Sequence, residues 1–119
     1  MMKEGKLEEA AKLLNEAIEE NPQDAVAFTN FGNLLAAVHE EEKAITFFNK
    51  AIELDESLGT AYYGKGNIFF NQGNYKDAIE AYQQALNKGL LQGDVYYMIG
   101  YSYYQLGDLI RALPSFQRA

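Results

Sequence analysis

Residues 59–66 read GTAYYGKG, which matches all but the last position of the phosphate-binding loop pattern G-x-x-x-x-G-K-[ST]. In that loop, backbone N–H groups and the lysine hold the phosphates of a nucleotide, while the final hydroxyl binds Mg²⁺. Gly66 stands where that hydroxyl would be, so the segment lacks the residue that binds the metal ion. The role of these glycines depends on where they recur in the chain.

Small and aromatic residues recur at one fixed interval along the whole chain. The alanines form two series, Ala10, Ala44, Ala78, Ala112 and Ala17, Ala51, Ala85, Ala119. The glycines form a third series, Gly32, Gly66 and Gly100. Large apolar residues form a fourth, Leu14, Phe48, Tyr82 and Phe116. Four series that share one period, of about 34 residues, indicate an internal repeat.

Gly66 belongs to the glycine series and therefore to the packing of the repeat. Because glycine has no Cβ atom, it would let two helices of one repeat approach each other closely. This close approach would explain why glycine is kept inside a helix, where it is less favourable than alanine by about 1 kcal/mol. No strand pattern precedes residue 59, whereas a phosphate loop follows a strand. We interpret residues 59–66 as helix and expect the chain to bind no nucleotide, cofactor or metal ion.

Each repeat reads as two helices, because apolar residues recur at steps of three and four. Gly73 and Gly107 predict left-handed ends of a first helix. His39 occupies the same position one repeat earlier, and we expect a slightly strained turn there, since His tolerates positive φ better than most residues. Asn74 and Asp108 are expected to cap the next helix. The predicted helices span residues 6–20, 25–37, 41–54, 59–71, 75–88, 93–105 and 109–119.

This pattern resembles the tetratricopeptide repeat (TPR) family, whose unit is a helix–turn–helix with the same period. The first matching set is Phe28, Gly32, Leu35, Ala44, Phe48 and Ala51. The second is Tyr62, Gly66, Phe69, Ala78, Tyr82 and Ala85, and the third is Tyr96, Gly100, Tyr103, Ala112, Phe116 and Ala119. The resemblance implies an all-α fold, a right-handed solenoid of antiparallel helix pairs, with about three full repeats after a leading half repeat.

We expect one TPR domain over residues 1–119. In the family register, residues 6–22 are the second helix of an incomplete repeat, 25–58 and 59–92 are repeats, and 93–119 is a repeat truncated at its C-terminal end. The first helix, with Leu14 and Ile18, lacks its own partner, and the last, with Leu109, Leu113 and Phe116, lacks a following unit. The chain is then either a fragment of a longer array or a molecule whose ends pack on other molecules.

In the TPR family, one face of each first helix lines a concave groove that receives peptides. The resemblance implies that this groove is lined here by Thr29, Asn30, Asn33, Tyr63, Asn67, Phe70, Asn71, Tyr97, Tyr101 and Tyr104. Asparagine amides offer both a donor and an acceptor to the backbone of an extended ligand. Tyrosines supply a large amphipathic contact area at low entropic cost.

One subtype of the family holds a C-terminal carboxylate with lysine and arginine side chains. Here Thr29 and Tyr63 stand where a lysine is expected. Asp94 and Met98 stand where a lysine and an arginine are expected. A free carboxylate would meet no cation at these positions, so this specificity is not expected.

Composition narrows the function classes further. The net charge of −7 argues against a nucleic-acid partner, because an acidic surface repels a phosphate backbone. No apolar run reaches the roughly 18 residues of a membrane span, and no signal-peptide pattern opens the chain. The chain has no cysteine and a single histidine, His39, so no catalytic set is recognisable. We expect a cytoplasmic protein that is not an enzyme.

The resulting hypothesis is a protein–protein interaction module, an adaptor or scaffold, that binds a peptide or protein segment in the groove. The alternative is a self-assembling scaffold that forms homo-oligomers through its uncapped terminal helices. No membrane partner is expected under either hypothesis.

Overall fold

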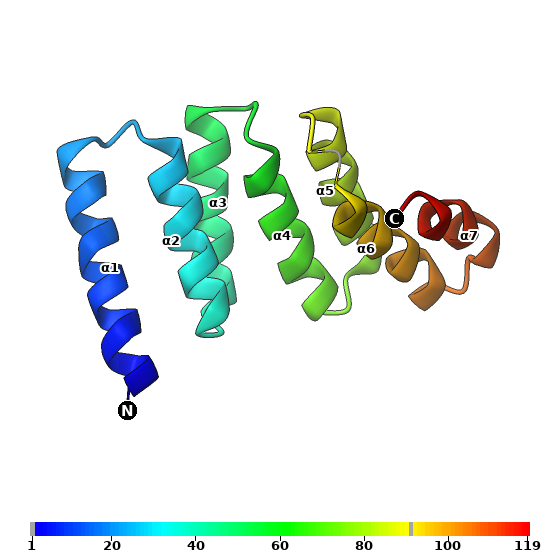
Figure 1. Ribbon diagram of the computed structural model, residues 1–119, viewed down its shortest axis with the longest axis horizontal. Helices are drawn as coiled ribbons and strands as arrows, with labels where there is room; N and C mark the ends of the chain where they lie inside the picture. Colours follow the sequence, from blue (N-terminus) through cyan, green and yellow to red (C-terminus); the bar gives the residue numbers. More distant parts are fainter. Residues whose placement is uncertain (1, 91) are drawn as a thin grey trace. The chain divides into compact units, whose positions relative to one another are not determined.

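The computed structural model describes the backbone of residues 2–90 and 92–119, and the side chains of residues 8–90 and 92–119. Its seven helices are α1 (Met2–Glu20), α2 (Ala25–Ala37), α3 (Glu41–Leu54), α4 (Gly59–Asn71), α5 (Tyr75–Asn87), α6 (Gly93–Gln105) and α7 (Leu109–Arg118) (Figure 1). No strand occurs in these residues, which confirms the all-α prediction. The predicted start of the first helix, residue 6, lies four residues inside α1, while the other ends differ by at most one residue.

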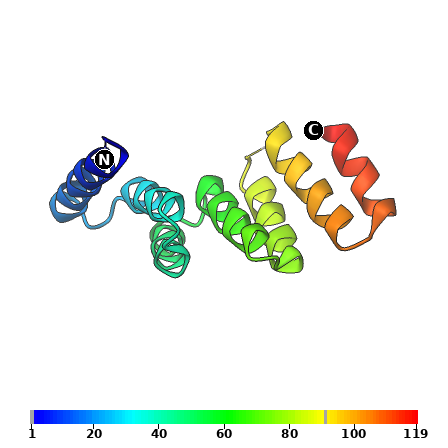
Figure 2. The ribbon, with the colours of Figure 1, turned by 90° about the horizontal axis from the view of Figure 1, so that it is seen from below.

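The helices divide into two compact units, Met1–Glu56 and Ser57–Ala119. In the first unit α2 packs against both α1 and α3. In the second unit α4 packs on α5, α5 on α6 and α6 on α7; Figure 2 shows the last two side by side. Each unit is therefore a set of sequential helix neighbours, as the repeat predicts. No helix of the described residues is long and apolar enough to cross a membrane.

The glycine series lies where the two helices of each repeat cross. An ideal Cβ atom added at any of the three glycines would overlap an aromatic ring of the following helix. The closest approaches are 2.7 Å from Gly32 to Phe48, 2.6 Å from Gly66 to Tyr82 and 2.9 Å from Gly100 to Phe116. Gly66 is buried within α4, so the predicted packing role of this glycine, and the helical state of residues 59–66, are confirmed.

The alanine series supplies small residues at the most crowded positions. Ala44, Ala78 and Ala85 have no exposed surface, and Ala112 is 2% exposed. A larger side chain at such a position forces its neighbours off their preferred rotamers, at about 1–3 kcal/mol. The small residues thus let the aromatic residues fill the space between the helices.

Four of the five turn residues have the conformation or capping role that the sequence predicts. Gly73, Gly107 and His39 have positive φ angles of 80°, 81° and 65°. Asp108 caps α7, because its carboxylate accepts a hydrogen bond from the backbone N–H of Arg111 at 3.2 Å. The prediction for Asn74 is wrong in its mechanism: its side chain makes no capping bond to α5 and donates to Gln72 Oε1 at 3.3 Å instead.

Pro114 lies inside α7, and the helix continues past it to Arg118. Proline has no N–H to donate to the carbonyl of Ile110, one turn earlier. The helix is packed against the rest of the unit through Ala112, which is almost fully buried. In addition, the Ser115 hydroxyl donates to the Arg111 carbonyl at 3.2 Å.

Candidate functional site

Four of the predicted groove residues form one cluster of rings in the second unit. We call this cluster the aromatic face; it consists of Phe70, Tyr97, Tyr101 and Tyr104. Tyr101 lies at its centre, with ring centroids 5.4 Å from Phe70, 6.1 Å from Tyr97 and 6.1 Å from Tyr104. The rings meet edge-on or tilted, which is the favoured arrangement for aromatic pairs.

Aromatic side chains of the second helices of the repeats pack against two of these rings. Phe70 of α4 packs edge-on against Tyr75 of α5 at 5.3 Å. Tyr97 of α6 packs against Phe116 of α7 at 5.6 Å. Tyr97 nevertheless stays 48% exposed and Tyr104 52% exposed. The aromatic face therefore offers apolar surface to a ligand while its rings are held in place.

Polar groups on the aromatic face are free to bind. Among the described side chains, no hydrogen-bond partner is found for the hydroxyls of Tyr97, Tyr101 and Tyr104. Asp94 lies three residues before Tyr97, on the same face of α6, and is exposed. The sequence of α6 contains no lysine or arginine. Its exposed tyrosine side is thus uncharged except for one carboxylate.

Asn67 takes part in a hydrogen bond that the sequence did not predict. The hydroxyl of Tyr82 on α5 donates to Asn67 Oδ1 on α4 at 2.6 Å. Tyr82 has no exposed surface, and this burial raises the pKa of its phenol, with the neighbouring Tyr63 adding to the effect. Because the amide oxygen is occupied, Asn67 keeps its Nδ2 donor for a ligand.

Comparing equivalent positions of the repeats gives one indication of the hydrogen bond between Tyr82 and Asn67. Tyr82 stands where Phe48 stands in the first unit, and Asn67 where Asn33 stands. Phe48 has no hydroxyl that could donate a hydrogen bond to Asn33, and Asn33 is exposed. The two asparagines, equivalent in sequence, therefore have different surroundings.

The remaining predicted groove residues differ in their exposure. Asn30 and Asn33 of α2 and Asn71 of α4 are exposed. Tyr63 is half-buried, with its ring 5.6 Å from that of Tyr82. Thr29 is 3% exposed, and its hydroxyl donates to the carbonyl of Ala25 at 3.0 Å. Thr29 is therefore too buried to contact a ligand, unlike the exposed asparagines.

Lys65 stands at a position where the neighbouring repeats have Phe31 and Ile99. It is half-buried and, with Tyr62, Asp77 and other residues, lines a hollow of about 450 Å³. Burial lowers the pKa of its amine, and the charge of Glu80 opposes this effect. The expected packing of its aliphatic stem agrees with this partial burial.

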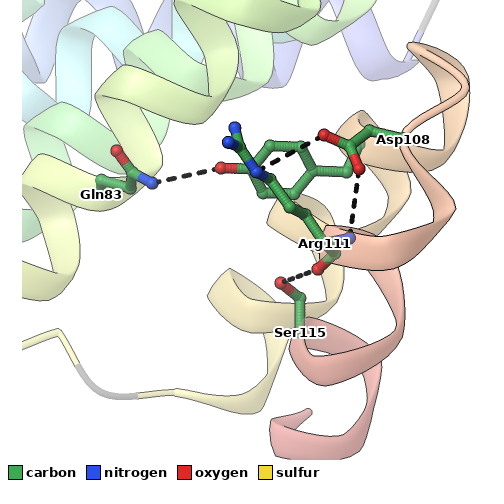
Figure 3. A network of polar contacts seen from close by, with 5 residues as sticks. Gln83, Asp108, Arg111 and Ser115 are labelled. Carbon is green, nitrogen blue, oxygen red and sulfur yellow. Dashed lines mark hydrogen bonds and ion pairs between the residues drawn. The ribbon is translucent and has the colours of Figure 1, made fainter.

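A second polar cluster lies on another side of α6, and sequence reasoning missed it. Figure 3 shows Gln83 of α5 and Arg111 of α7 directed toward one another. Gln83 Nε2 donates to the hydroxyl of Tyr103 at 3.5 Å, and Arg111 Nε lies 3.6 Å from Asp108 Oδ2. The repeat pattern includes Tyr103 and Asp108, but it gave no signal that Gln83 and Arg111 would join them, because these two polar residues were not part of any repeated series that we identified.

Comparison with known proteins agrees with this geometry. Three family models, each described as a tetratricopeptide repeat, match residues 1–65, 59–88 and 93–119. The first of them covers more than half of the chain. A curated relative, the TPR repeat-containing protein YrrB of Bacillus subtilis (strain 168), is 51% identical over 41 residues, which are 34% of this chain and 20% of YrrB.

Solved structures show the same fold. The crystal structure of YrrB, described as "a TPR protein with an unusual peptide-binding site", is similar with a TM-score of 0.87 and 44% identity. The match covers 91% of this chain and 56% of that one. A structure of MamA protein is similar with a TM-score of 0.85 and 26% identity, covering 98% of this chain and 64% of MamA. The chain thus spans little more than half the length of the YrrB structure.

Proposed function

Because the chain belongs to the tetratricopeptide repeat family, we propose that it is a protein-interaction module that binds an extended peptide segment on the aromatic face. One observation carries the proposal: Tyr97, Tyr101 and Tyr104 form a supported row of rings with free hydroxyls. The peptide-binding site named for the similar YrrB structure is consistent with it. Catalysis is not part of this proposal.

Each group on this surface has a separate role in the proposal. The tyrosine rings provide contact area, and their hydroxyls donate to or accept from the peptide backbone. Asn67 donates its Nδ2 to a peptide carbonyl, since its oxygen is held by Tyr82. Asn71 is exposed on the same helix and is proposed as a second amide that contacts the peptide. In the first unit, Asn30 and Asn33 are proposed as further contacts.

Selection from a random peptide display library on the immobilised chain tests this function. Peptides that bind are then measured by calorimetry against wild type and against the variant with Tyr97, Tyr101 and Tyr104 replaced by Ala. We expect the triple variant to lose binding. Gln105→Ala, an exposed neighbour at the end of α6, is the matched control and should bind as wild type does. Equal binding by the triple variant would place the site elsewhere.

A second candidate, self-association, is favoured by the apolar side of α7. Leu109 is 63% exposed and Leu113 60% exposed. With Tyr104, Ala112 and Phe116 they line a hollow of about 360 Å³. Burying such surface contributes about 25 cal/mol per Å², so covering several hundred Å² would favour association by a few kcal/mol. Sedimentation of wild type and of Leu113→Glu tests it; the variant should associate less.

A further inference from the structure

Another hollow, of about 380 Å³, lies among α5, α6 and α7 of the second unit. Leu86 and Ile99 form part of its apolar lining, and Ile110, which is 87% exposed, lies at its edge. Arg111 and Arg118 also line it, whereas no carboxylate does. We call this site the arginine hollow. It lies away from the aromatic face, because Tyr96, Ile99 and Tyr103 project from nearly the opposite side of α6 to Tyr97, Tyr101 and Tyr104.

Neither arginine is fully engaged within the chain. The side chain of Arg111 is 70% exposed, and its contact with Asp108 is long, at 3.6 Å. An exposed pair of this kind contributes little, at most about 1 kcal/mol. Arg118 lies over the ring of Tyr96 with its guanidinium carbon 5.9 Å from the centroid. Both guanidinium groups therefore retain free N–H donors for a carboxylate.

The spacing of the two arginines indicates the distance that two carboxylates of a ligand must span. They are seven residues apart on α7, so their backbones lie about 10.5 Å apart along the helix axis. Two carboxylate residues that are seven residues apart on another helix are separated by the same distance as the two arginines. An apolar residue between them, at the fourth step, would then face the apolar lining of the hollow.

The chain contains such a helix face itself. On α1, Glu9, Leu13 and Glu16 follow one another at steps of four and three, so they share one side of the helix. Both glutamates are exposed, and Leu13 is 60% exposed. This side of α1 faces away from Leu14 and Ile18, which are half-buried. Charge is complementary too: residues 1–56 carry five cations and thirteen acids, whereas residues 57–119 carry five cations and four acids.

We propose that the arginine hollow binds α1 of a second copy of this chain. Glu9 and Glu16 of one copy pair with Arg111 and Arg118 of the next, and Leu13 packs on Leu86 and Ile110. The contact is head-to-tail, because the two surfaces differ, and it leads to open chains of molecules. The inference rests on the second candidate function, self-association, and gives it a surface other than the apolar side of α7.

A charge exchange tests the contact by sedimentation velocity on the full chain. Arg111→Glu with Arg118→Glu, and separately Glu9→Arg with Glu16→Arg, should each weaken self-association by tenfold or more, since attraction becomes repulsion at two pairs. An equimolar mixture of the two double variants should associate again, because each has the surface that the other lost. Raising the salt from about 0.05 to 0.5 M should weaken the wild-type contact.

Two further variants separate this contact from the apolar side of α7. Leu13→Asn leaves all charges in place and should weaken association. Leu113→Glu removes any association through the apolar side of α7, and the association that remains should still respond to the two charge exchanges and to salt. Circular dichroism establishes that each variant is folded. A wild type that associates to the same extent as both double variants would overturn this contact but leave self-association standing. A wild type that stays monomeric at millimolar concentration would overturn both.

Discussion

The hydroxyl of Tyr82 donates a hydrogen bond of 2.6 Å to Oδ1 of Asn67, joining the buried side of α5 to a partly exposed side chain of α4. The bond fixes the orientation of the amide, because the oxygen must face Tyr82 and Nδ2 is left as the free donor. Tyr82 is thus a positioning residue in our account. It acts on a ligand only through Asn67.

Replacing Tyr82 by Phe tests this relationship with little change in volume, since Phe48 fills the equivalent position in the first unit. The variant loses one hydrogen bond, and we expect the free energy of unfolding to fall by about 1 kcal/mol. Urea denaturation measures this. A double-mutant cycle with Asn67→Ala should give a coupling energy of similar size. Strict additivity would contradict a direct interaction between the two side chains.

Alkaline pH gives a second test of the same residue. The folded state raises the pKa of Tyr82 above the ordinary value of 10.0, because ionising a buried phenol is unfavourable. Its contribution to stability is therefore complete below pH 10.0 and is lost as the pH rises toward the folded-state value. Wild type should lose stability above pH 10 more steeply than Tyr82→Phe. Parallel stability curves for the two proteins would contradict this.

Gly66→Ala tests the close approach of α4 and α5. The new Cβ would lie 2.6 Å from the Tyr82 ring, which is fully buried and cannot move freely. We expect overpacking of about 1–3 kcal/mol to exceed the roughly 1 kcal/mol that alanine contributes to helix propensity. Thermal unfolding should show a lower Tm. A rise in Tm would mean that the helices have room to spare.

Tyr101→Ala is expected to affect stability as well as binding. Tyr101 contacts three rings, and each aromatic pair contributes about 0.5–1.5 kcal/mol beyond burial. The three pairs together give an expected loss of about 1.5–4.5 kcal/mol of unfolding free energy in urea. Tyr104 has a single ring contact and is the matched comparison: Tyr104→Ala should lose less than half as much.

The sequence predicted the fold well because the repeat period assigns both the small residues and the turns. Gly66 and Ala78 are determined by close packing of main chains, which recurs in every repeat. The burial of Thr29 and the bond between Tyr82 and Asn67 were not predictable in this way. They depend on the direction of single side chains, and residues at the same repeat position differ in it.

The arginine hollow escaped prediction for a related reason. Arg111 and Arg118 lie on the polar part of α7, outside the repeated columns, so only the packing of three helices shows that they border one hollow. Conversely, Phe70, Tyr97, Tyr101 and Tyr104 were among the groove residues that the resemblance to the family implied. What the resemblance did not indicate is the support that Tyr75 and Phe116 give to its rings.

The affinity of Tyr104→Ala for a peptide selected on wild type shows whether the aromatic face binds a peptide. Tyr104 is 52% exposed and contributes little to packing, so its truncation reports on contact with the ligand. Isothermal titration calorimetry should give a Kd weaker by about 5- to 30-fold, or 1–2 kcal/mol, while circular dichroism shows that the variant is folded at the temperature of the titration. An unchanged Kd, with the same peptide and an equally folded variant, would contradict the claim.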